Sequence, residues 1–303
     1  MTALLATVTS AGFATVQDGG RPGFTHVGVP LSGAFHRERH LVSSGLLGGA
    51  LGARRPAIEL LSGALVLTAS TDLLLAVVGP ARCEIDERRA AVGAVVIVTQ
   101  GSVVRVSVNG RGPVYVAVDG WEPELVLGSA ATDTFSGLGG SLLRPGDRLM
   151  GSVTVANRAE RVGAFHRPLP LPSGAVRIVG TGHPALRSFA AGTWSVTAAS
   201  RSGVRLAGGP IAASGSVASA PLLPGAIQLT PGGEPIVIGP DGGLTGGYPV
   251  VAVVASADLD RLSLLNPGDG VGFRVVDVVE AAAARREQLR LTRASIAHPD
   301  HLP

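Results

Sequence analysis

Glycine and proline constrain the fold of this chain more than any other feature, because they recur along its whole length. The 303 residues include 43 glycines and 21 prolines, which interrupt helices and central strands and favour tight turns. Between them lie short runs rich in Val, Leu and Ile, such as Leu73 to Val78, Val103 to Val108 and Val250 to Val254. Few segments of helix length separate these runs, so the pattern favours barrels or sandwiches over alternating strands and helices. We predict a mainly β protein.

Three segments have the composition of helices. One spans about His36 to Leu47, a short one begins near Ala257, and a last one runs from about Val278 to Leu291. The last segment, EAAAARREQLR, is rich in strong helix formers and mostly polar outside its alanines. We expect it to lie on the surface or against a partner.

A proline-rich string divides the chain. RPLPLPS, from Arg167 to Ser173, can form neither a helix nor a central strand and predicts a linker. We therefore expect a first β lobe in residues 1-170, a second in residues 173-278, and a C-terminal helix and tail in residues 279-303.

A repeated turn hints that the two lobes are related. Leu143 to Asp147 reads LRPGD and Leu265 to Asp269 reads LNPGD, each just before an expected closing strand. Pro-Gly-Asp is a common turn, so either coincidence or duplication explains the match.

Composition excludes several classes of function. The chain has no lysine, which rules out a Schiff base and the lysine of a phosphate-binding P-loop. The net charge of +3 is small and the arginines alternate with acids, so no nucleic-acid partner is expected. The single Cys83 excludes a Cys-rich zinc site, and the histidines show no metal-binding spacing, so no metal is expected.

The sequence is expected to carry no targeting signal. The first residues are strand-like and lack a charged segment before an apolar core, so no signal peptide is expected. The longest apolar runs are far too short to span a bilayer. We expect a soluble cytoplasmic protein with no membrane partner.

The first motif lies near the N-terminus, where TVQDGGRPG (Thr15 to Gly23) is followed by GVPLSGA (Gly28 to Ala34). Asp18 and the glycines predict a tight turn that brings Arg21 back over the end of the first strand. Ser32 precedes a predicted helix, where its hydroxyl is expected to cap free amide groups. Asp18 and Arg21 are open to two interpretations, a turn-stabilising ion pair or groups that bind a ligand.

The second motif consists of three strings: PGAIQ (Pro224 to Gln228), TGGYP (Thr245 to Pro249) and ADLDRL (Ala257 to Leu262). The paired glycines Gly246 and Gly247 allow the backbone to approach a neighbour or a ligand closely. Thr245 and Tyr248 are expected to present hydroxyls to a cleft, although a buried tyrosine satisfied internally fits the same pattern.

Together these strings resemble one family, which contains the C subunit of 5-oxoprolinase, the Kip-type antagonist of a sporulation-kinase inhibitor, allophanate hydrolase subunit 2 and the carboxyltransferase region of urea carboxylase. VLGS (Val126 to Ser129) and a following GLGG lie between the two motifs in the family's order. The resemblance covers about residues 15 to 275. It implies two tandem cyclophilin-like β-barrel lobes with a few short helices.

The resemblance also implies that the chain works in a complex. The expected partner is a homologous smaller subunit, similar to the B subunit of 5-oxoprolinase or to allophanate hydrolase subunit 1, and a third oxoprolinase subunit is a further candidate. In the family's enzyme these subunits together open 5-oxoproline to glutamate at the expense of ATP. ATP is therefore expected to be used by the complex, without a motif in this chain. Biotin is not expected on this chain, because it has no Met-Lys acceptor pair.

The chain departs from the family's pattern mainly at polar positions. His36 replaces a usual Asp, and Gly243 to Thr245 replaces Gln-Thr-Thr, while the glycines and prolines persist. We expect Arg201 or Arg205 to hold an anionic substrate by bidentate hydrogen bonds, with the TGGYP string orienting it. The sequence identifies no catalytic residue. The substrate-binding candidates are the residues that survive in the matched strings: Asp18, Arg21, Ser32, Arg201, Arg205, Gln228, Thr245, Gly246, Gly247 and Tyr248.

Three functions remain open. The first is a subunit of a hetero-oligomeric, ATP-dependent hydrolase that processes amides, resembling 5-oxoprolinase or allophanate hydrolase. The second is a non-catalytic regulatory protein of the Kip type that sequesters its smaller partner. The third is a carboxyltransferase module of a biotin-dependent system similar to urea carboxylase.

Overall fold

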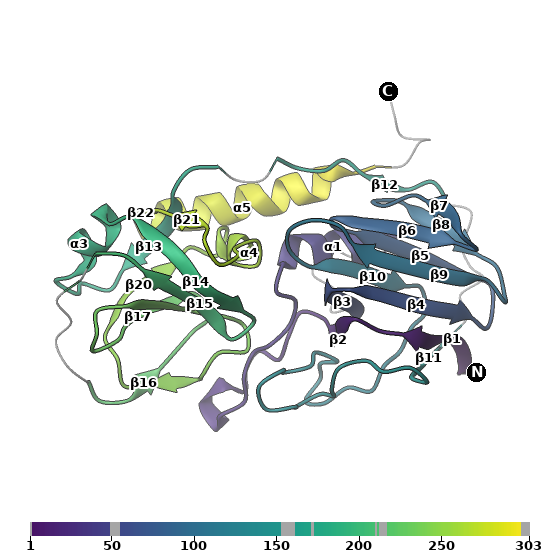
Figure 1. Cartoon of the computed structure of the whole chain (residues 1–303), viewed down its shortest axis with the longest axis horizontal. Coiled ribbons are helices and arrows are strands. Elements are labelled where there is room, and N and C mark those ends of the chain that lie inside the picture. The colour runs from purple at the N-terminus through teal and green to yellow at the C-terminus, as the bar shows by residue number, and fades with distance from the viewer. Residues whose placement is uncertain are drawn as a thin grey trace. The chain divides into compact units, whose positions relative to one another are not determined.

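The computed structural model describes residues 2–48, 55–152, 161–170, 173–209, 211 and 217–297. Within them the chain is mainly β, as predicted, and has four α-helices where three were predicted. The helices are α1 (Arg37–Leu46), α3 (Leu186–Ala191), α4 (Leu259–Leu262) and α5 (Val278–Ser295), and a 3₁₀ turn, η1, spans Thr25–Val27 (Figure 1).

The chain forms two compact units. Unit 1 comprises residues 1–21, 32–169 and 291–303, and unit 2 comprises residues 22–31 and 170–290. The sequence places the boundary at the same proline-rich string, of which residues 171 and 172 lie outside the described part. It gives residues 22–31 to the first lobe, however, whereas they cluster with unit 2.

Unit 1 contains two main sheets. The larger has six strands in the order β11-β1-β4-β9-β6-β7, the smaller has five in the order β2-β3-β10-β5-β8, and a short ladder joins β12 to β23. The strand bounds are β1 (Ala3–Ser10), β2 (Phe13–Gln17), β3 (Ala57–Ser62), β4 (Ala64–Ala69), β5 (Leu73–Val78), β6 (Ala81–Ile85), β7 (Arg88–Ala90), β8 (Val95–Val98), β9 (Val103–Val108), β10 (Val114–Val118), β11 (Arg148–Gly151), β12 (Phe165–His166) and β23 (Ile296–Ala297).

Strand β10 shows how the core of unit 1 is built. Val114, Val116 and Val118 belong to the core shared by the two sheets. Tyr115 and Ala117 belong to a second cluster with residues of α1, because successive side chains of a strand point to opposite faces. Both faces of this sheet are therefore buried at its strands β5 and β10, which explains why these two strands are apolar throughout rather than alternating.

Unit 2 contains an eight-stranded sheet that is nearly a closed barrel, in the order β21-β14-β15-β18-β17-β20-β13-β22. Its two edge strands, β21 and β22, are separated in the chain by Gly272 alone, so both ends of the sheet meet. A separate ladder pairs β16 with β19. The strand bounds are β13 (Val176–Gly180), β14 (Trp194–Ser200), β15 (Gly203–Ala207), β16 (Ala220–Pro221), β17 (Ala226–Leu229), β18 (Pro235–Ile238), β19 (Thr245–Gly246), β20 (Val250–Val254), β21 (Gly270–Val271) and β22 (Phe273–Val275).

The two Pro-Gly-Asp turns form the same hydrogen bonds. In unit 1, Gly146 N donates to Val8 O of β1 and Val8 N donates to Asp147 O, both at 2.8 Å. In unit 2, Gly268 and Asp269 make the same two bonds, also at 2.8 Å, with Val196 of β14. Each turn thus fastens the start of a closing strand to a long strand of its own unit, which favours duplication over coincidence.

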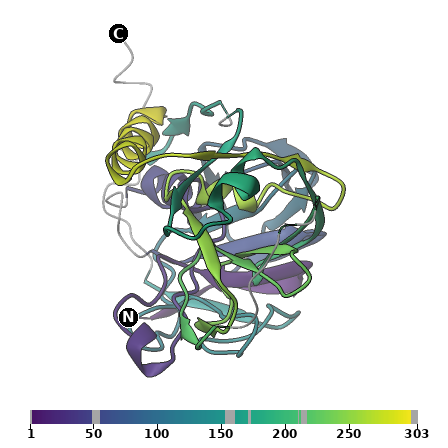
Figure 2. The ribbon, with the colours of Figure 1, turned by 90° about the vertical axis from the view of Figure 1, so that its left-hand side faces the viewer.

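The C-terminal helix α5 is mostly exposed, with only Thr292 and Ser295 buried among its residues. Asp277 begins the helix, because its Oδ1 accepts the Glu280 amide at 2.7 Å. The boundary between the units falls inside this helix, after Arg290. Figure 2 shows α5 nearly end-on. No helix in the described part of the chain is both long and apolar enough to cross a bilayer.

Candidate functional site

Asp18 lies at the centre of a buried polar framework in unit 1. Its Oδ1 accepts the Gly20 amide at 2.8 Å and the Ser129 hydroxyl at 2.6 Å. Its Oδ2 accepts the Ala130 amide at 2.8 Å. The carboxylate, 1% exposed, therefore joins the N-terminal motif to the VLGS string more than a hundred residues later. A buried carboxylate needs such donors to remain stable.

Arg21 fastens the same loop from the other side. Its Nε donates to Val126 O at 3.0 Å, and its Nη2 donates to Ser129 O at 3.5 Å and to Ala131 O. The side chain is fully buried. Asp18 and Arg21 thus both hold the segment from Val126 to Ala131, which is a structural task for the TVQDGGR and VLGS strings.

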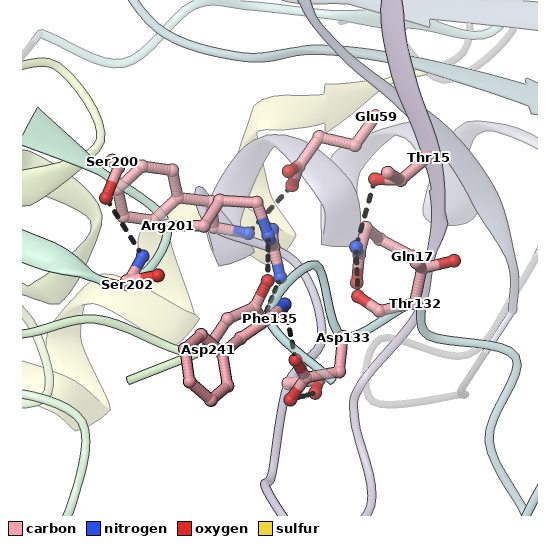
Figure 3. Close-up of polar contacts among 12 residues, drawn as sticks. Thr15, Gln17, Glu59, Thr132, Asp133, Phe135, Ser200, Arg201, Ser202 and Asp241 are labelled. Atoms are coloured by element: carbon pink, nitrogen blue, oxygen red, sulfur yellow. Dashed lines mark hydrogen bonds and ion pairs between the residues drawn. The ribbon is translucent and has the colours of Figure 1, made fainter. Parts of the chain in front are cut away.

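Gln17 and Thr132 offer polar atoms that the fold does not use. The Gln17 amide nitrogen donates to Thr15 Oγ1 at 3.0 Å and to Thr132 O at 2.9 Å, as Figure 3 shows. Gln17 Oε1 and Thr132 Oγ1 are buried without a hydrogen-bond partner among the described residues. Unpaired buried polar atoms are rare. The fold therefore leaves one acceptor and one hydroxyl unsatisfied at this place.

Ser32 contacts a carboxylate rather than the helix. Its hydroxyl donates to Asp133 Oδ2 at 3.3 Å, and Asp133 Oδ1 accepts the amides of Phe135 and Ser136 at 2.8 and 2.9 Å. Ser32 has φ +51°, the left-handed region that few non-glycine residues adopt. The prediction that Ser32 caps the helix is wrong, because its hydroxyl is already directed to Asp133.

His36 caps α1 instead. Its Nδ1 accepts the Arg39 amide at 3.5 Å. The backbone N–H of His36 donates to Tyr115 Oη at 2.9 Å, and Tyr115 Oη donates to Glu59 Oε2 at 2.5 Å. His36 therefore supplies the N-cap acceptor of α1.

His40 packs edge-on against the Tyr115 ring, with centroids 5.7 Å apart, and its Nε2 lies 2.9 Å from Arg55 O. Desolvation by burial lowers the pKa of His40, and the backbone hydrogen bond to Arg55 opposes this shift. This histidine therefore stays neutral and serves the fold.

In unit 2, Arg201 forms a buried ion pair. Its Nε and Nη2 donate to the two carboxylate oxygens of Asp241, each at 2.7 Å, and the side chains are 2% and 0% exposed (Figure 3). Breaking a buried pair costs about 3–5 kcal/mol because it leaves an uncompensated charge. Arg201 thus uses the two N–H groups that were predicted to hold an anionic substrate to bind the carboxylate of Asp241 instead. Arg205, on β15, is exposed.

The TGGYP string packs against Gln228 of β17. Gln228 Nε2 donates to Tyr248 O at 3.3 Å. A side chain at Gly246 would overlap the Gln228 amide, so the glycine permits this close approach. Thr245 is exposed and Tyr248 is 38% exposed, which leaves both hydroxyls accessible. Gly247 lies between them.

A pocket of about 200 Å³ lies within unit 2. The loop from Pro22 to Leu31 forms one wall and the chain from Leu222 to Leu244 forms another, so segments from both motifs border one hollow. Apolar and backbone groups predominate in its lining, which consists of Pro22, Gly23, Thr25, Leu31, Leu222, Leu223, Pro224, Ile238, Gly239, Pro240, Gly242, Gly243 and Leu244.

Comparison with known proteins identifies the family. The carboxyltransferase domain, subdomains A and B, matches residues 27–275. The C subunit of the 5-oxoprolinase of Escherichia coli is 30% identical over 95% of this chain and 96% of that protein. The chain belongs to the carboxyltransferase-domain family. The corresponding C subunit of Haemophilus influenzae is 28% identical over 90% of this chain and 92% of that protein.

Larger members of the carboxyltransferase-domain family contain the same region. The urea amidolyase of Lachancea kluyveri is 28% identical over 93% of this chain, which corresponds to 17% of that protein. The crystal structure of TTHA0988 superposes with a TM-score of 0.81 and 31% identity, over 89% of this chain and 56% of the TTHA0988 chain. The chain thus spans about half the length of that solved protein. The family and the mainly β fold predicted from the sequence are confirmed.

Sequence reasoning missed several residues of the site. Gln17 stands in the TVQD string but is not among the predicted candidates, and Thr132 and Asp133 follow the VLGS string. Asp241 belongs to a Pro-Asp-Gly-Gly turn and gives no signal of its buried pairing with Arg201. Only contacts between distant segments identify these four residues, although the position of Gln17 next to Asp18 is a usable hint.

Proposed function

We propose that the chain is a subunit of a hetero-oligomeric, ATP-dependent hydrolase that opens the cyclic amide of 5-oxoproline to give glutamate. The observation that supports this most is the match to the C subunits of two 5-oxoprolinases over at least nine tenths of both chains. The buried framework around Asp18 and Arg21 supports the proposal, because it fixes the backbone of the TVQDGGR and VLGS strings in this chain. Its partners would be the homologous smaller subunit and the third oxoprolinase subunit.

Gln17 and Thr132 fit the recognition of an amide. A lactam presents one N–H donor and one carbonyl acceptor. Gln17 Oε1 can accept from the first and the Thr132 hydroxyl can donate to the second, and neither atom has a partner among the described residues. The Ser32 hydroxyl, held by Asp133, supplies a further polar group in unit 1. Satisfying buried polar groups with a matching ligand strongly favours that ligand over analogues that lack the groups.

Of the two arginines predicted to hold an anionic substrate, both in unit 2, only Arg205 presents an exposed side chain. Arg201 already makes a bidentate pair with Asp241, whereas the Arg205 side chain is exposed on β15. ATP binding falls to the partners, because this chain has no lysine to hold a nucleotide phosphate. The chain's own contribution is then to bind and orient the amide.

The test is reconstitution of the complex, with 5-oxoproline-dependent ATP hydrolysis as the readout. Thr132→Val replaces the hydroxyl by a methyl group of similar size and breaks no internal side-chain bond, so the fold should persist. We expect kcat/KM for 5-oxoproline to fall about 10–100-fold, corresponding to a lost hydrogen bond in a desolvated site. Thr71→Val, at the turn between β4 and β5, is the matched control and should leave kcat/KM unchanged.

A stable complex without 5-oxoproline-dependent ATP hydrolysis would contradict the proposal and favour a regulatory binding protein. The match to urea amidolyase gives a specific reason to test a second function, carboxyl transfer to urea from carboxybiotin. Urea-dependent turnover with a biotin carboxylase partner, in the absence of any response to 5-oxoproline, would establish that alternative.

A further inference from the structure

A second hollow lies wholly within unit 1, at the C-terminal end of α1 and the end of β10. We call it the arginine pocket. Its volume is about 290 Å³, which is at the lower end of the range for small-molecule sites. None of the described residues that line it is among the candidates drawn from the sequence motifs. They are Ser44, Leu47, Arg55, Pro56, Ala117, Val118, Asp119, Gly120, Trp121, Glu122 and Arg161.

Two guanidinium groups share one carboxylate in this pocket. Arg161 Nη1 donates to Asp119 Oδ1 at 2.8 Å, and Arg55 Nη1 lies 3.7 Å from the same oxygen. The Arg55 and Arg161 side chains are 40% and 19% exposed. Arg55, Arg161 and Asp119 together therefore carry one net positive charge among the described residues that line the pocket, and both guanidinium groups retain further N–H donors. Glu122 is exposed, so water screens its opposing charge.

Ser44 adds a donor that the fold does not use. Its Oγ is buried and has no hydrogen-bond partner among the described residues. The preceding Ser43 is different, since its hydroxyl donates to His40 O at 2.9 Å. A helical serine ordinarily bonds to a carbonyl of the preceding turn in this way. The unpaired Ser44 hydroxyl therefore points to a ligand in the pocket that it lines.

The remaining walls are apolar and held in place. Leu47, Pro56 and Trp121 line the pocket, and Trp121 is buried to 8% exposure. The backbone of Arg55 is fixed because its carbonyl lies 2.9 Å from His40 Nε2. The site is thus largely formed in advance, which lowers the entropic cost of binding.

We propose that the arginine pocket binds a small organic anion, with a carboxylate or phosphate group on Arg55, Arg161 and the Ser44 hydroxyl. The apolar part of the ligand packs against Trp121 and Leu47. Guanidinium groups suit such anions because their planar N–H groups match the geometry of carboxylate and phosphate oxygens. Asp119 is a positioning residue, which holds the two guanidinium groups together without contacting the ligand.

Binding can be followed through Trp121. The chain has two tryptophans, and the other, Trp194, lies in unit 2. Inorganic phosphate and glutamate serve as separate probes, titrated up to about 10 mM because a simple anion site is expected to bind in the millimolar range. We expect saturable fluorescence changes with at least one probe, and isothermal titration calorimetry gives an independent measurement. The probe that binds more tightly distinguishes a phosphate from a carboxylate ligand.

Three variants and one control test the assignment. Arg55→Gln and Arg161→Gln should each weaken anion binding about 10-fold or more, because each removes a charge-assisted hydrogen bond. Ser44→Ala should weaken it about 3–10-fold and leaves no internal hydrogen bond broken. Arg82→Gln, which removes an exposed charge of the same unit that pairs with Glu84, is the control and should bind as the parent does.

Asp119→Asn gives the opposite expectation for an anion and a cation. Removal of its negative charge should leave anion affinity unchanged or raise it, whereas a cation site would lose its ligand group. The proposal is overturned if neither probe binds, if binding survives both Arg55→Gln and Ser44→Ala, or if Asp119→Asn abolishes binding while Arg161→Gln retains it. Thermal unfolding of each variant identifies any that fail to fold, and Arg55 and Ser44 remain testable in that case.

Discussion

Gly139 is the residue at which the buried framework of unit 1 tolerates least change. A side chain here would overlap Arg21 Nη2 and Ala131 O, and the residue has φ +82°. Gly139→Ala should therefore destabilise the fold by about 3–5 kcal/mol, measured by denaturant unfolding, because it both strains the backbone and displaces a buried arginine. Gly137→Ala is the matched control, since its φ is +76° with no atom within 4 Å of the added carbon.

The control should cost only about 1 kcal/mol, which is the strain of the left-handed backbone alone. Equal losses at the two positions would show that the packing of Arg21 against the GLGG string contributes nothing to stability. The comparison isolates the effect of the framework from that of the turn. It also tests whether the TVQDGGR and GLGG strings contribute to the stability of the fold.

The two Pro-Gly-Asp turns make a prediction at the scale of elements. Asp147 Oδ2 accepts the Arg144 amide at 2.7 Å, and Asp269 Oδ2 accepts the Asn266 amide at 2.8 Å. Asp147→Ala and Asp269→Ala should each cost at least about 0.5–1.5 kcal/mol in denaturant unfolding, because each removes the side-chain bond that closes its turn.

The corresponding asparagine variants keep an acceptor oxygen and are the controls, with smaller losses expected. A large effect in one unit and none in the other would mean that the two turns only look alike. Similar losses in the free energy of unfolding would support a shared origin of the two units, because the same turn would then contribute equally to the stability of both.

Local sequence determines the elements well and their long-range contacts poorly. The runs Leu73–Val78 and Val103–Val108 coincide with β5 and β9, because β-branched and apolar side chains bounded by turn residues define strand ends locally. Helix α3 is not predicted. It has only six residues and no side-chain cap. Tertiary packing therefore stabilises this helix, because its own helix propensity is too weak to do so.

The candidate site is predictable only in part. The motifs correctly direct attention to the strings that build it, but not to the task of each side chain. Arg201 is a reasonable ligand group because an arginine suits an anion, yet Asp241, forty residues later, occupies it. The pairing of distant charges depends on the fold of the whole sheet, and no local pattern encodes it.

At the scale of the whole molecule, unit 2 includes a segment from far away in the sequence, Pro22 to Leu31. This segment clusters with residues 170–290 and lines the unit 2 pocket opposite Leu222 and Leu244. A second lobe cut from the chain at the proline-rich string would lack this wall. Its pocket-lining apolar side chains would then face water.

We therefore expect the fragment 170–290 to be less stable alone than with residues 22–31 joined to its N-terminus by a flexible Gly/Ser linker. The gain should be about 1–2 kcal/mol, since the decapeptide covers a few partly buried apolar side chains, and denaturant unfolding measures it. A fusion carrying the same ten residues in scrambled order is the control. If both fusions unfold at the same denaturant concentration, the N-terminal motif contributes no stability to the barrel. A gain confined to the native order would mean that neither motif alone forms the pocket that their residues line.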